Sequence, residues 1–315
     1  MARPESSVHT FPTHLLGLLI GLTLGWGFNW PAMKLAVREM APMHFRTICL
    51  LAGAAGLFGF AVAGRLPMRV PADQWGRLTA IACVNMAGWN IFAIYGVSLI
   101  ASGRAAILGY TMPALAVVIS AVVLHERFTA RRAAGVLLGL SGMALLLSRE
   151  LHVVGRSPVG ALSMICAAFA WALGTVLMKR WPVSLPTTSF TAWQMVIAAA
   201  PVLALALIFE HGSFDPFSLS VWPMIGALYN IVVAFTFCYW AWTKIATEAP
   251  VGVSSLATMM IPVVGVFSSA LVLGESPHWQ DYTALALVVA SLGTVLIPSG
   301  MLRSLRGGRS SAPNL

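Results

Sequence analysis

Residues 14–34 read HLLGLLIGLTLGWGFNWPAMK, an apolar run that ends in tryptophan, proline and lysine. About 20 mostly apolar residues are enough for a helix to cross the hydrocarbon core of a bilayer. Nine further runs of this kind follow, each bounded by charged residues, proline or glycine. The pattern predicts ten transmembrane helices, at 14–34, 43–63, 75–97, 103–123, 130–148, 158–178, 188–209, 221–243, 251–273 and 280–298.

The composition is typical of a chain that lies in lipid. Of the 315 residues, 58% are hydrophobic and 9% are charged, and the mean hydropathy is +0.84. Soluble domains have about 25% charged residues, so the composition excludes a water-soluble globular protein. The predicted fold class is an all-α polytopic membrane protein.

The positive charges predict how the chain is oriented. The net charge is +9, but the basic residues stand singly or in pairs between apolar runs, which excludes the clustered basic face of a nucleic-acid-binding protein. When loops are assigned alternately to two sides, 13 of the 19 Lys and Arg lie on the N-terminal side. The other side holds Lys34, Arg38, Arg46, Arg104, Arg149 and Arg156. By the positive-inside rule, the tails 1–12 and 299–315 are both cytoplasmic and the number of spans is even.

The two halves of the chain resemble each other. Residues of the first run recur in order 145 positions later, where Trp26, Met33 and Lys34 fall on Trp171, Met178 and Lys179. A shift of 149 places Pro113 on Pro262 and Glu126 on Glu275. Five spans per half make the second half upside down relative to the first. This predicts two inverted five-helix repeats, 13–148 and 157–298, a plan typical of secondary transporters.

Short motifs recur in both halves. The first copy has Tyr110-Thr-Met-Pro113, then His125-Glu126-Arg127, then Gly135, Gly139 and Gly142. The second has Met260-Ile-Pro262, Gly274-Glu275 and Gly293. Over residues 13–298 this pattern resembles the EamA-type repeat of the drug/metabolite transporter superfamily. The Trp-rich, Asn-punctuated helices are most similar to the aromatic amino acid exporters of Gram-negative inner membranes.

The resemblance implies an arrangement and a location. It implies a basket of ten short helices around a central cavity, in a multi-pass protein of the bacterial inner membrane. It also implies export of small amphipathic metabolites, with no tightly bound cofactor. The partners expected are therefore the lipid bilayer and a small-molecule substrate, an aromatic or other neutral amino acid, and the chain is expected to function as a monomer.

Polar and aromatic side chains inside the spans are the candidates for substrate contact. An unpartnered polar group in hydrocarbon costs several kcal/mol, so such groups should face the bundle interior or a wet cavity. The alternative for these side chains is hydrogen bonding between helices. The candidates are Trp26, Asn29, Asn85, Asn90, Tyr95, Tyr110, Trp171, Gln194, Tyr229, Asn230 and Tyr239.

Two spacing arguments refine this set. Asn85 and Trp89 are four residues apart and are expected to share one helix face. Trp26 and Trp171 occupy equivalent depths under the repeat, and each is expected either to line the cavity or to belong to an interfacial belt. Tryptophans nearer the span ends are interpreted as that belt, namely Trp30, Trp75, Trp181, Trp222 and Trp279.

Ionisable groups and prolines complete the predictions. No Asp or Glu lies in the middle of a predicted span, so facilitated movement is favoured over proton coupling, for which His44 is the nearest candidate. Glu275 and Glu126 are expected to accept hydrogen bonds from backbone N–H groups rather than to bind substrate. Pro113 and Pro262 are expected to break the helical ladder, either as static kinks or as hinges.

Several functions compete with amino acid export. A membrane-embedded enzyme would need acids, His or Ser grouped at one depth, and no HExxH, DxD or GxSxG motif is present, so no catalytic or metal-binding residues are expected. A carrier of nucleotide-linked sugars would need Lys or Arg deep in a cavity, and none is expected at mid-span. An exporter of cationic compounds would need a buried Glu. A zwitterion with an aromatic or large apolar side chain fits best by elimination.

Overall fold

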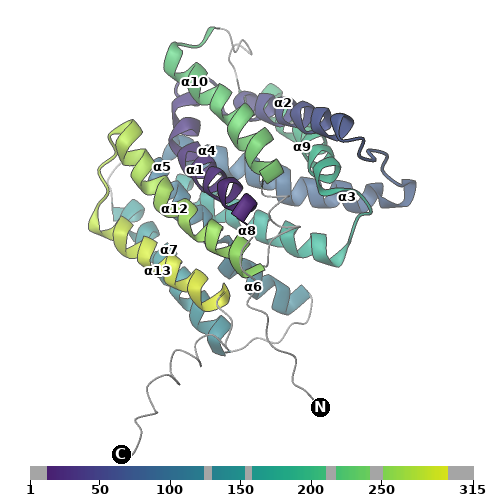
Figure 1. Cartoon of the computed structure of the whole chain (residues 1–315). Helices are drawn as coiled ribbons and strands as arrows, with labels where there is room; N and C mark the ends of the chain where they lie inside the picture. The colour runs from purple at the N-terminus through teal and green to yellow at the C-terminus, as the bar shows by residue number, and fades with distance from the viewer. Residues whose placement is uncertain (1–12, 124–129, 153–157, 211–217, 242–250, 297–315) are drawn as a thin grey trace, which may run out of the picture.

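The computed structural model describes residues 13–123, 130–152, 158–210, 218–241 and 251–296, and these residues form helices and no strand (Figure 1). The described helices are α1 (Thr13–Ala36), α2 (Pro42–Ala63), η1 (Ala72–Gln74), α3 (Trp75–Ile81), η2 (Ala82–Gly88), α4 (Trp89–Leu99), α5 (Ser102–Gly109), α6 (Met112–Val123), α7 (Ala130–His152), α8 (Val159–Arg180), α9 (Thr187–Phe209), α10 (Val221–Tyr229), η4 (Asn230–Cys238), α12 (Val251–Leu273) and α13 (Trp279–Leu296).

Two of the predicted spans contain a wider, π-helical segment. In the third span, η2 joins α3 to α4, and in the eighth, η4 follows α10. Both segments are π-helices, which are rare and occur frequently at functional sites. A π-helical turn holds more residues than an α-helical turn. The side chains that follow it therefore point in directions that a regular 3.6-residue period does not predict.

The fourth predicted span is divided into two helices. α5 ends at Gly109 and α6 begins at Met112, so Tyr110 and Thr111 lie between them. Pro113 is the second residue of α6, a position where its missing N–H costs little. Pro262 lies inside the continuous helix α12. The two prolines were expected at matched breaks, but only Pro113 adjoins one, and hinge motion at either stays a prediction.

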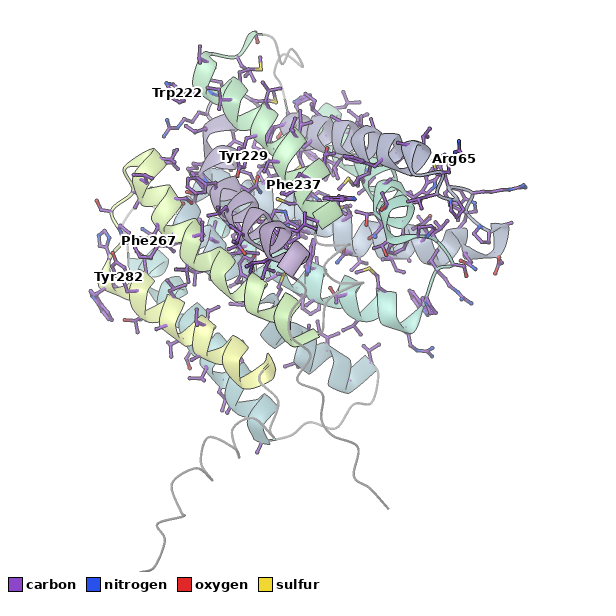
Figure 2. All side chains as sticks on the ribbon, viewed as in Figure 1. Arg65, Trp222, Tyr229, Phe237, Phe267 and Tyr282 are labelled. Atoms are coloured by element: carbon purple, nitrogen blue, oxygen red, sulfur yellow. The ribbon has the colours of Figure 1, made fainter. Side chains whose placement is uncertain are left out.

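The surface of the bundle is apolar enough for a bilayer. Among the described residues, the segments Pro42–Ala63, Ala72–Leu99, Val159–Met178, Thr187–Phe209 and Val221–Ala241 are long and apolar enough to span a membrane, and the shorter Ala133–Gly142 and Val263–Leu273 are also apolar. Large side chains such as Trp222, Phe267 and Tyr282 lie on the outside of the bundle (Figure 2). The chain is a multi-pass membrane protein, and the number of ten crossings stays a prediction.

The main packing contacts join helices that are distant in sequence. α2 packs on α9, α13 on α7, α1 on α12 and α4 on α8 (Figure 1). In each pair, one helix comes from before residue 153 and the other from after residue 157. The core that they bury includes Trp30, Phe45, Met86, Ile107 and Met164. The two parts of the chain therefore meet along a shared interior.

Candidate functional site

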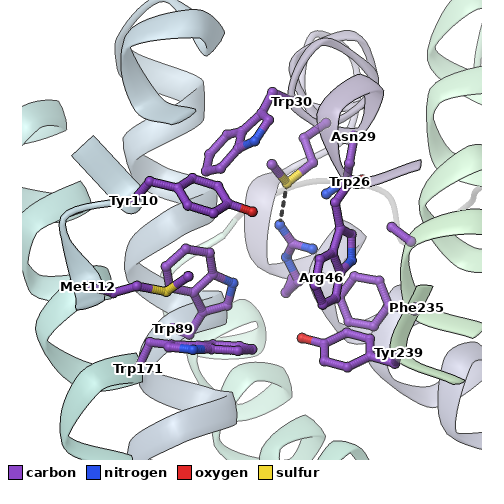
Figure 3. Close-up of a pocket in the computed structure, with 12 residues that line it drawn as sticks. Trp26, Asn29, Trp30, Arg46, Trp89, Tyr110, Met112, Trp171, Phe235 and Tyr239 are labelled. Carbon is purple, nitrogen blue, oxygen red and sulfur yellow. Dashed lines mark hydrogen bonds between the residues drawn. The ribbon is translucent and has the colours of Figure 1, made fainter. Parts of the chain in front are cut away.

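A cavity lies where these helices meet (Figure 3). The space that a water molecule can enter is about 70 Å³, and the volume rises to about 590 Å³ when the part open to the mouth is counted. Its walls come from α1, α2, α4, α6, α8 and η4, together with the segments that flank η4 and α6. The lining residues are Trp26, Asn29, Trp30, Met33, Arg46, Trp89, Tyr110, Met112, Trp171, Ala234, Phe235 and Tyr239.

Aromatic pairs form two walls of this cavity. The rings of Trp89 and Trp171 lie 5.2 Å apart between centroids at an interplanar angle of 65°. On the other side, Trp26 and Tyr239 lie 5.6 Å apart at 82°, and Phe235 lies 5.7 Å from Tyr239. Edge-on pairs of this kind are favourable and hold the rings in place. The result is a space between flat apolar faces with a few polar atoms at the edges.

Trp171 is positioned by close packing between α8 and η2. The Asn85 side-chain amide donates a hydrogen bond of 3.1 Å to the Trp171 carbonyl oxygen. One turn further along α8, a side-chain carbon at Gly174 would collide with Asn85. The absence of a side chain at Gly174 therefore lets the two helices approach closely enough for this hydrogen bond.

Arg46 is the charged side chain among the residues that line the cavity. It lies in the second turn of α2 with only 2% of its surface exposed. One guanidinium nitrogen donates to the Met33 sulfur at 2.8 Å, and the group lies 5.4 Å from the Phe45 ring and 5.3 Å from the Phe235 ring. The buried Nε has no hydrogen-bond partner. The Arg46 guanidinium thus contacts a thioether and two ring faces, and in the described part of the chain no carboxylate pairs with it.

Five of the predicted substrate-contact residues line the cavity, namely Trp26, Asn29, Tyr110, Trp171 and Tyr239. Six others are not among its lining residues, namely Asn85, Asn90, Tyr95, Gln194, Tyr229 and Asn230. Several of the six donate hydrogen bonds to backbone carbonyl oxygens instead. Asn90 and Asn230 each donate to the carbonyl four residues earlier in the same helix, at 2.7 and 3.0 Å, and the Tyr229 hydroxyl donates to the Gly25 carbonyl at 2.9 Å. Contact with substrate stays a prediction for all eleven.

Asn85 and Trp89 were expected to share a face, yet only Trp89 lines the cavity. Asn85 lies within the π-helical segment and Trp89 directly after it. Both residues meet Trp171, Asn85 through the hydrogen bond to its carbonyl oxygen and Trp89 through its ring. The shared face therefore stays a prediction, and of the two side chains only Trp89 lines the cavity.

Two residues were interpreted wrongly from the sequence. Trp30 was interpreted as part of an interfacial belt, but α1 continues to Ala36 and Trp30 is 4% exposed in the cavity wall. Arg46 was grouped with the loop residues of one side, although it falls inside the predicted span 43–63. Its position inside a predicted span could have identified Arg46 as a residue of the bundle interior. The other residues missed are Met33, Met112, Ala234 and Phe235, whose apolar side chains carry no distinguishing pattern.

Carboxylates elsewhere in the bundle accept hydrogen bonds from the N-termini of helices. Glu275 accepts from the backbone N–H groups of Ser102 and Gly103 at 2.9 and 3.2 Å, and from the Ser102 hydroxyl. These backbone contacts agree with the expected role, and the helix concerned is α5, which is distant in sequence. Glu126 lies outside the described residues. Glu275 therefore joins the end of α12 to the start of α5.

A second carboxylate connects α9 to α2. Glu210 follows α9 and accepts from the backbone N–H groups of Met43 and His44 at 2.8 and 3.0 Å. The His44 ring nitrogen lies 3.1 Å from a Glu210 oxygen, and both side chains are buried. His44 thus takes part in a helix-end contact, and a role in proton coupling stays a prediction.

Two exposed or partly exposed groups make similar contacts. Glu39 accepts from the Ser220 N–H at 2.8 Å and from its hydroxyl, which holds the pKa of the Glu39 carboxyl below its usual range. The Lys34 ammonium donates to the carbonyls of Val97, Ser98 and Ile100 at 2.7 to 2.9 Å. Negative groups at helix N-termini and a positive group at a C-terminus both complement the helix dipole.

The fold and this cavity define a class, a helical membrane protein with an internal, aromatic-lined cavity. The EamA-like transporter family model matches residues 14–148 and again residues 158–297. The chain belongs to the EamA-like transporter family.

Individual proteins are also similar to the chain. The uncharacterized transporter YoaV of Bacillus subtilis is 27% identical over 265 residues, which cover 83% of this chain and 89% of that protein. A probable amino-acid metabolite efflux pump of Salmonella typhimurium is 22% identical, covering 85% of this chain and 89% of its own length. A protein of known crystal structure superposes with a TM-score of 0.66 over 93% of this chain and 99% of its own, at 19% identity, which shows the shared fold. These names indicate a transporter rather than an enzyme.

Proposed function

We propose that this protein exports small amphipathic metabolites, most notably aromatic and other neutral amino acids, across a bacterial inner membrane. The observation that carries the proposal is the cavity between the two parts of the chain, walled by Trp26, Trp89 and Trp171. Flat apolar walls with a few polar edges suit a molecule that has a ring and a polar end. The similarity to proteins named as amino-acid metabolite efflux pumps supports the same substrate class.

Alternating access needs two halves that exchange their roles, and two observations support an inverted repeat. The π-helical segments Ala82–Gly88 and Asn230–Cys238 are separated by about the same shift that relates the sequence motifs. The contacts are related in the same way, because α1 packs on α12 and on η4, while α8 packs on α5 with α6 and on η2. Under the shift, one set of contacts becomes the other. We therefore propose ten crossings in two inverted halves, 13–148 and 157–298.

Reconstitution tests the substrate class directly. The purified protein is placed in liposomes, and uptake of radiolabelled phenylalanine, tryptophan, leucine and threonine is measured with and without an imposed pH gradient. Uptake of the aromatic amino acids above that of protein-free liposomes is expected, and no dependence on the pH gradient is expected for facilitated movement. Absence of uptake for every neutral amino acid would contradict the proposal.

A second experiment tests the orientation. Reporter fusions after Leu315 and after His211 are expected to lie on opposite sides of the membrane, with Leu315 in the cytoplasm. The physical reason is the excess of Lys and Arg in loops on the N-terminal side. If both fusions report the same side, the ten-span inverted arrangement is wrong.

A third experiment tests the proposed monomeric state. It measures the mass of the detergent-solubilised particle.

A further inference from the structure

We propose that Arg46 binds the carboxylate of the transported molecule, and that the cavity selects aromatic monocarboxylates whether or not they carry an ammonium group. The inference rests on the proposed function in one respect, because it takes the cavity to be the transport site. It goes further by naming the group that the cavity recognises and by making the amino group of an amino acid dispensable.

The first argument is the incomplete pairing of a buried charge. A guanidinium has five N–H donors and stays charged in proteins, and a buried charge is costly unless it is paired. In the structure, Arg46 has a sulfur acceptor, two aromatic faces and a buried Nε with no partner. A carboxylate matches the guanidinium fork with two parallel hydrogen bonds. The missing partner of Arg46 is therefore what a substrate carboxylate supplies.

The second argument is where the acids lie. The acidic side chains that the structure describes are Glu39, Asp73, Glu210, Glu275 and Asp281, and none of them lines the cavity. Glu210 and Glu275 are engaged with the starts of α2 and α5. An anion therefore makes the occupied cavity neutral, whereas a zwitterion leaves its ammonium without a charged partner there. Because charges interact strongly away from water, this difference favours the anion.

The third argument is the position of Arg46 relative to the rings. In the close-up view, the Arg46 guanidinium lies between Tyr110 and Tyr239, whose hydroxyls point toward the same space, while Trp89 and Trp171 lie on one side of it (Figure 3). A carboxylate on Arg46 would then leave an aromatic body against the indoles. Asn29 has a buried amide oxygen without a partner, which can accept one N–H but carries no charge. An amino group is thus accommodated without being required.

The positive charge in the cavity comes from the first half of the chain only, among the residues that line it. The shift of 145 that places Phe45 on Phe190 places Arg46 on Thr191, a neutral residue. A single carboxylate site is therefore expected in the cavity. This favours monocarboxylates over dicarboxylates, whose second charge would have no cation among the lining residues.

The test uses three probes that share one ring and differ in charge. 3-Phenylpropionate has the carboxylate alone, phenylalanine has both groups, and phenylalaninamide has the ammonium alone. Binding of each to the full-length protein in detergent is measured by calorimetry. We expect 3-phenylpropionate to bind at least as tightly as phenylalanine, and phenylalaninamide to bind at least about 30-fold more weakly, the change typical of a lost buried charge pair. Equal binding of phenylalaninamide and phenylalanine would overturn the proposal without any mutation.

Variants then assign the effect to Arg46. Arg46→Gln is expected to weaken both carboxylate probes by about 30-fold or more and to leave phenylalaninamide unchanged, while Arg46→Lys, which keeps the charge, retains part of the binding. Arg38→Gln is the matched control, because Arg38 is exposed at the end of α1 and should change nothing. Unchanged carboxylate binding in a folded Arg46→Gln protein would overturn the proposal. If Arg46→Gln does not fold, the binding of the three probes to the wild type and to Arg46→Lys still tests whether Arg46 binds the carboxylate.

The two proposals fail in different ways. If the wild type transports phenylalanine but binds phenylalaninamide equally well, the proposed function stands and the role of Arg46 is wrong. If the wild type transports no neutral amino acid but binds 3-phenylpropionate in a way that depends on Arg46, the carboxylate site stands and the proposed substrate class is wrong.

Discussion

The charged groups at the helix ends and the charged group in the cavity differ in their partners. Glu210 and Glu275 each meet two or more backbone or side-chain donors at the start of a helix, so their charges are matched by groups of the protein itself. Arg46, in the cavity, meets a sulfur and two rings. The difference indicates which charges hold the helices in place and which one is left for a ligand. Changes at the helix ends should therefore affect stability, and changes in the cavity should affect binding.

The largest effect is expected for Glu210→Ala. It removes the acceptor of the Met43 and His44 N–H groups and leaves them, with the His44 ring, in a buried site. We expect a loss of about 3 kcal/mol in the free energy of unfolding, measured by thermal unfolding in detergent. Asp73→Ala, at an exposed position, is the control and should change little. Loss of transport in Glu210→Ala protein of unchanged stability would contradict the comparison.

The next effect concerns the cavity wall and is expected in transport rather than in stability. Trp171→Ala removes an indole that faces Trp89 and should weaken transport of aromatic amino acids relative to threonine and alanine by about 1–3 kcal/mol. Trp222→Ala is the matched control, because Trp222 is 67% exposed on the outside of the bundle. An equal loss for all substrates would mean that Trp171 has only a packing role.

A smaller effect is expected for Glu275→Gln. The amide keeps one acceptor oxygen for the start of α5 but loses the negative charge that complements it. Unfolding free energy should fall by about 1–2 kcal/mol, while the binding constant of 3-phenylpropionate or phenylalanine stays the same. A large loss of affinity at unchanged stability would place Glu275 among the binding residues.

The smallest effect is expected at Glu39, which is fully exposed. Its hydrogen bonds with Ser220 lower the pKa of the Glu39 carboxyl, so this contribution to stability is present at neutral pH and is lost as pH falls through the lowered value. The difference in thermal midpoint between wild type and Glu39→Gln should therefore be constant near neutrality and shrink only below about pH 4. A difference that vanishes already at pH 6 would mean that the contact does not stabilise the fold.

The sequence predicts the regular parts of this molecule well, because the length of an apolar run is a direct consequence of bilayer thickness. The predicted span 43–63 and α2 (Pro42–Ala63) differ by one residue. Contacts between distant segments leave no local pattern, so the partner of Glu275 could not be predicted. The cavity also forms between distant segments, so its full set of lining residues could not be predicted. Trp171 and Trp26 were found through the repeat, whereas Arg46 was missed because a single arginine near a span end is usually a loop residue.

The π-helical segment Ala82–Gly88 has a consequence for how such a cavity can change over evolution. Each residue added to or removed from a regular α-helix rotates everything beyond it by about 100°. A π-helical segment accommodates an extra residue in a wider turn, so deleting one residue within 82–88 would let the segment close as an ordinary α-helix and leave Trp89 near its present place beside Trp171. One residue can therefore be lost here while the residues that line the cavity stay in place, whereas the same deletion in a regular helix would turn the residues beyond it away from the cavity.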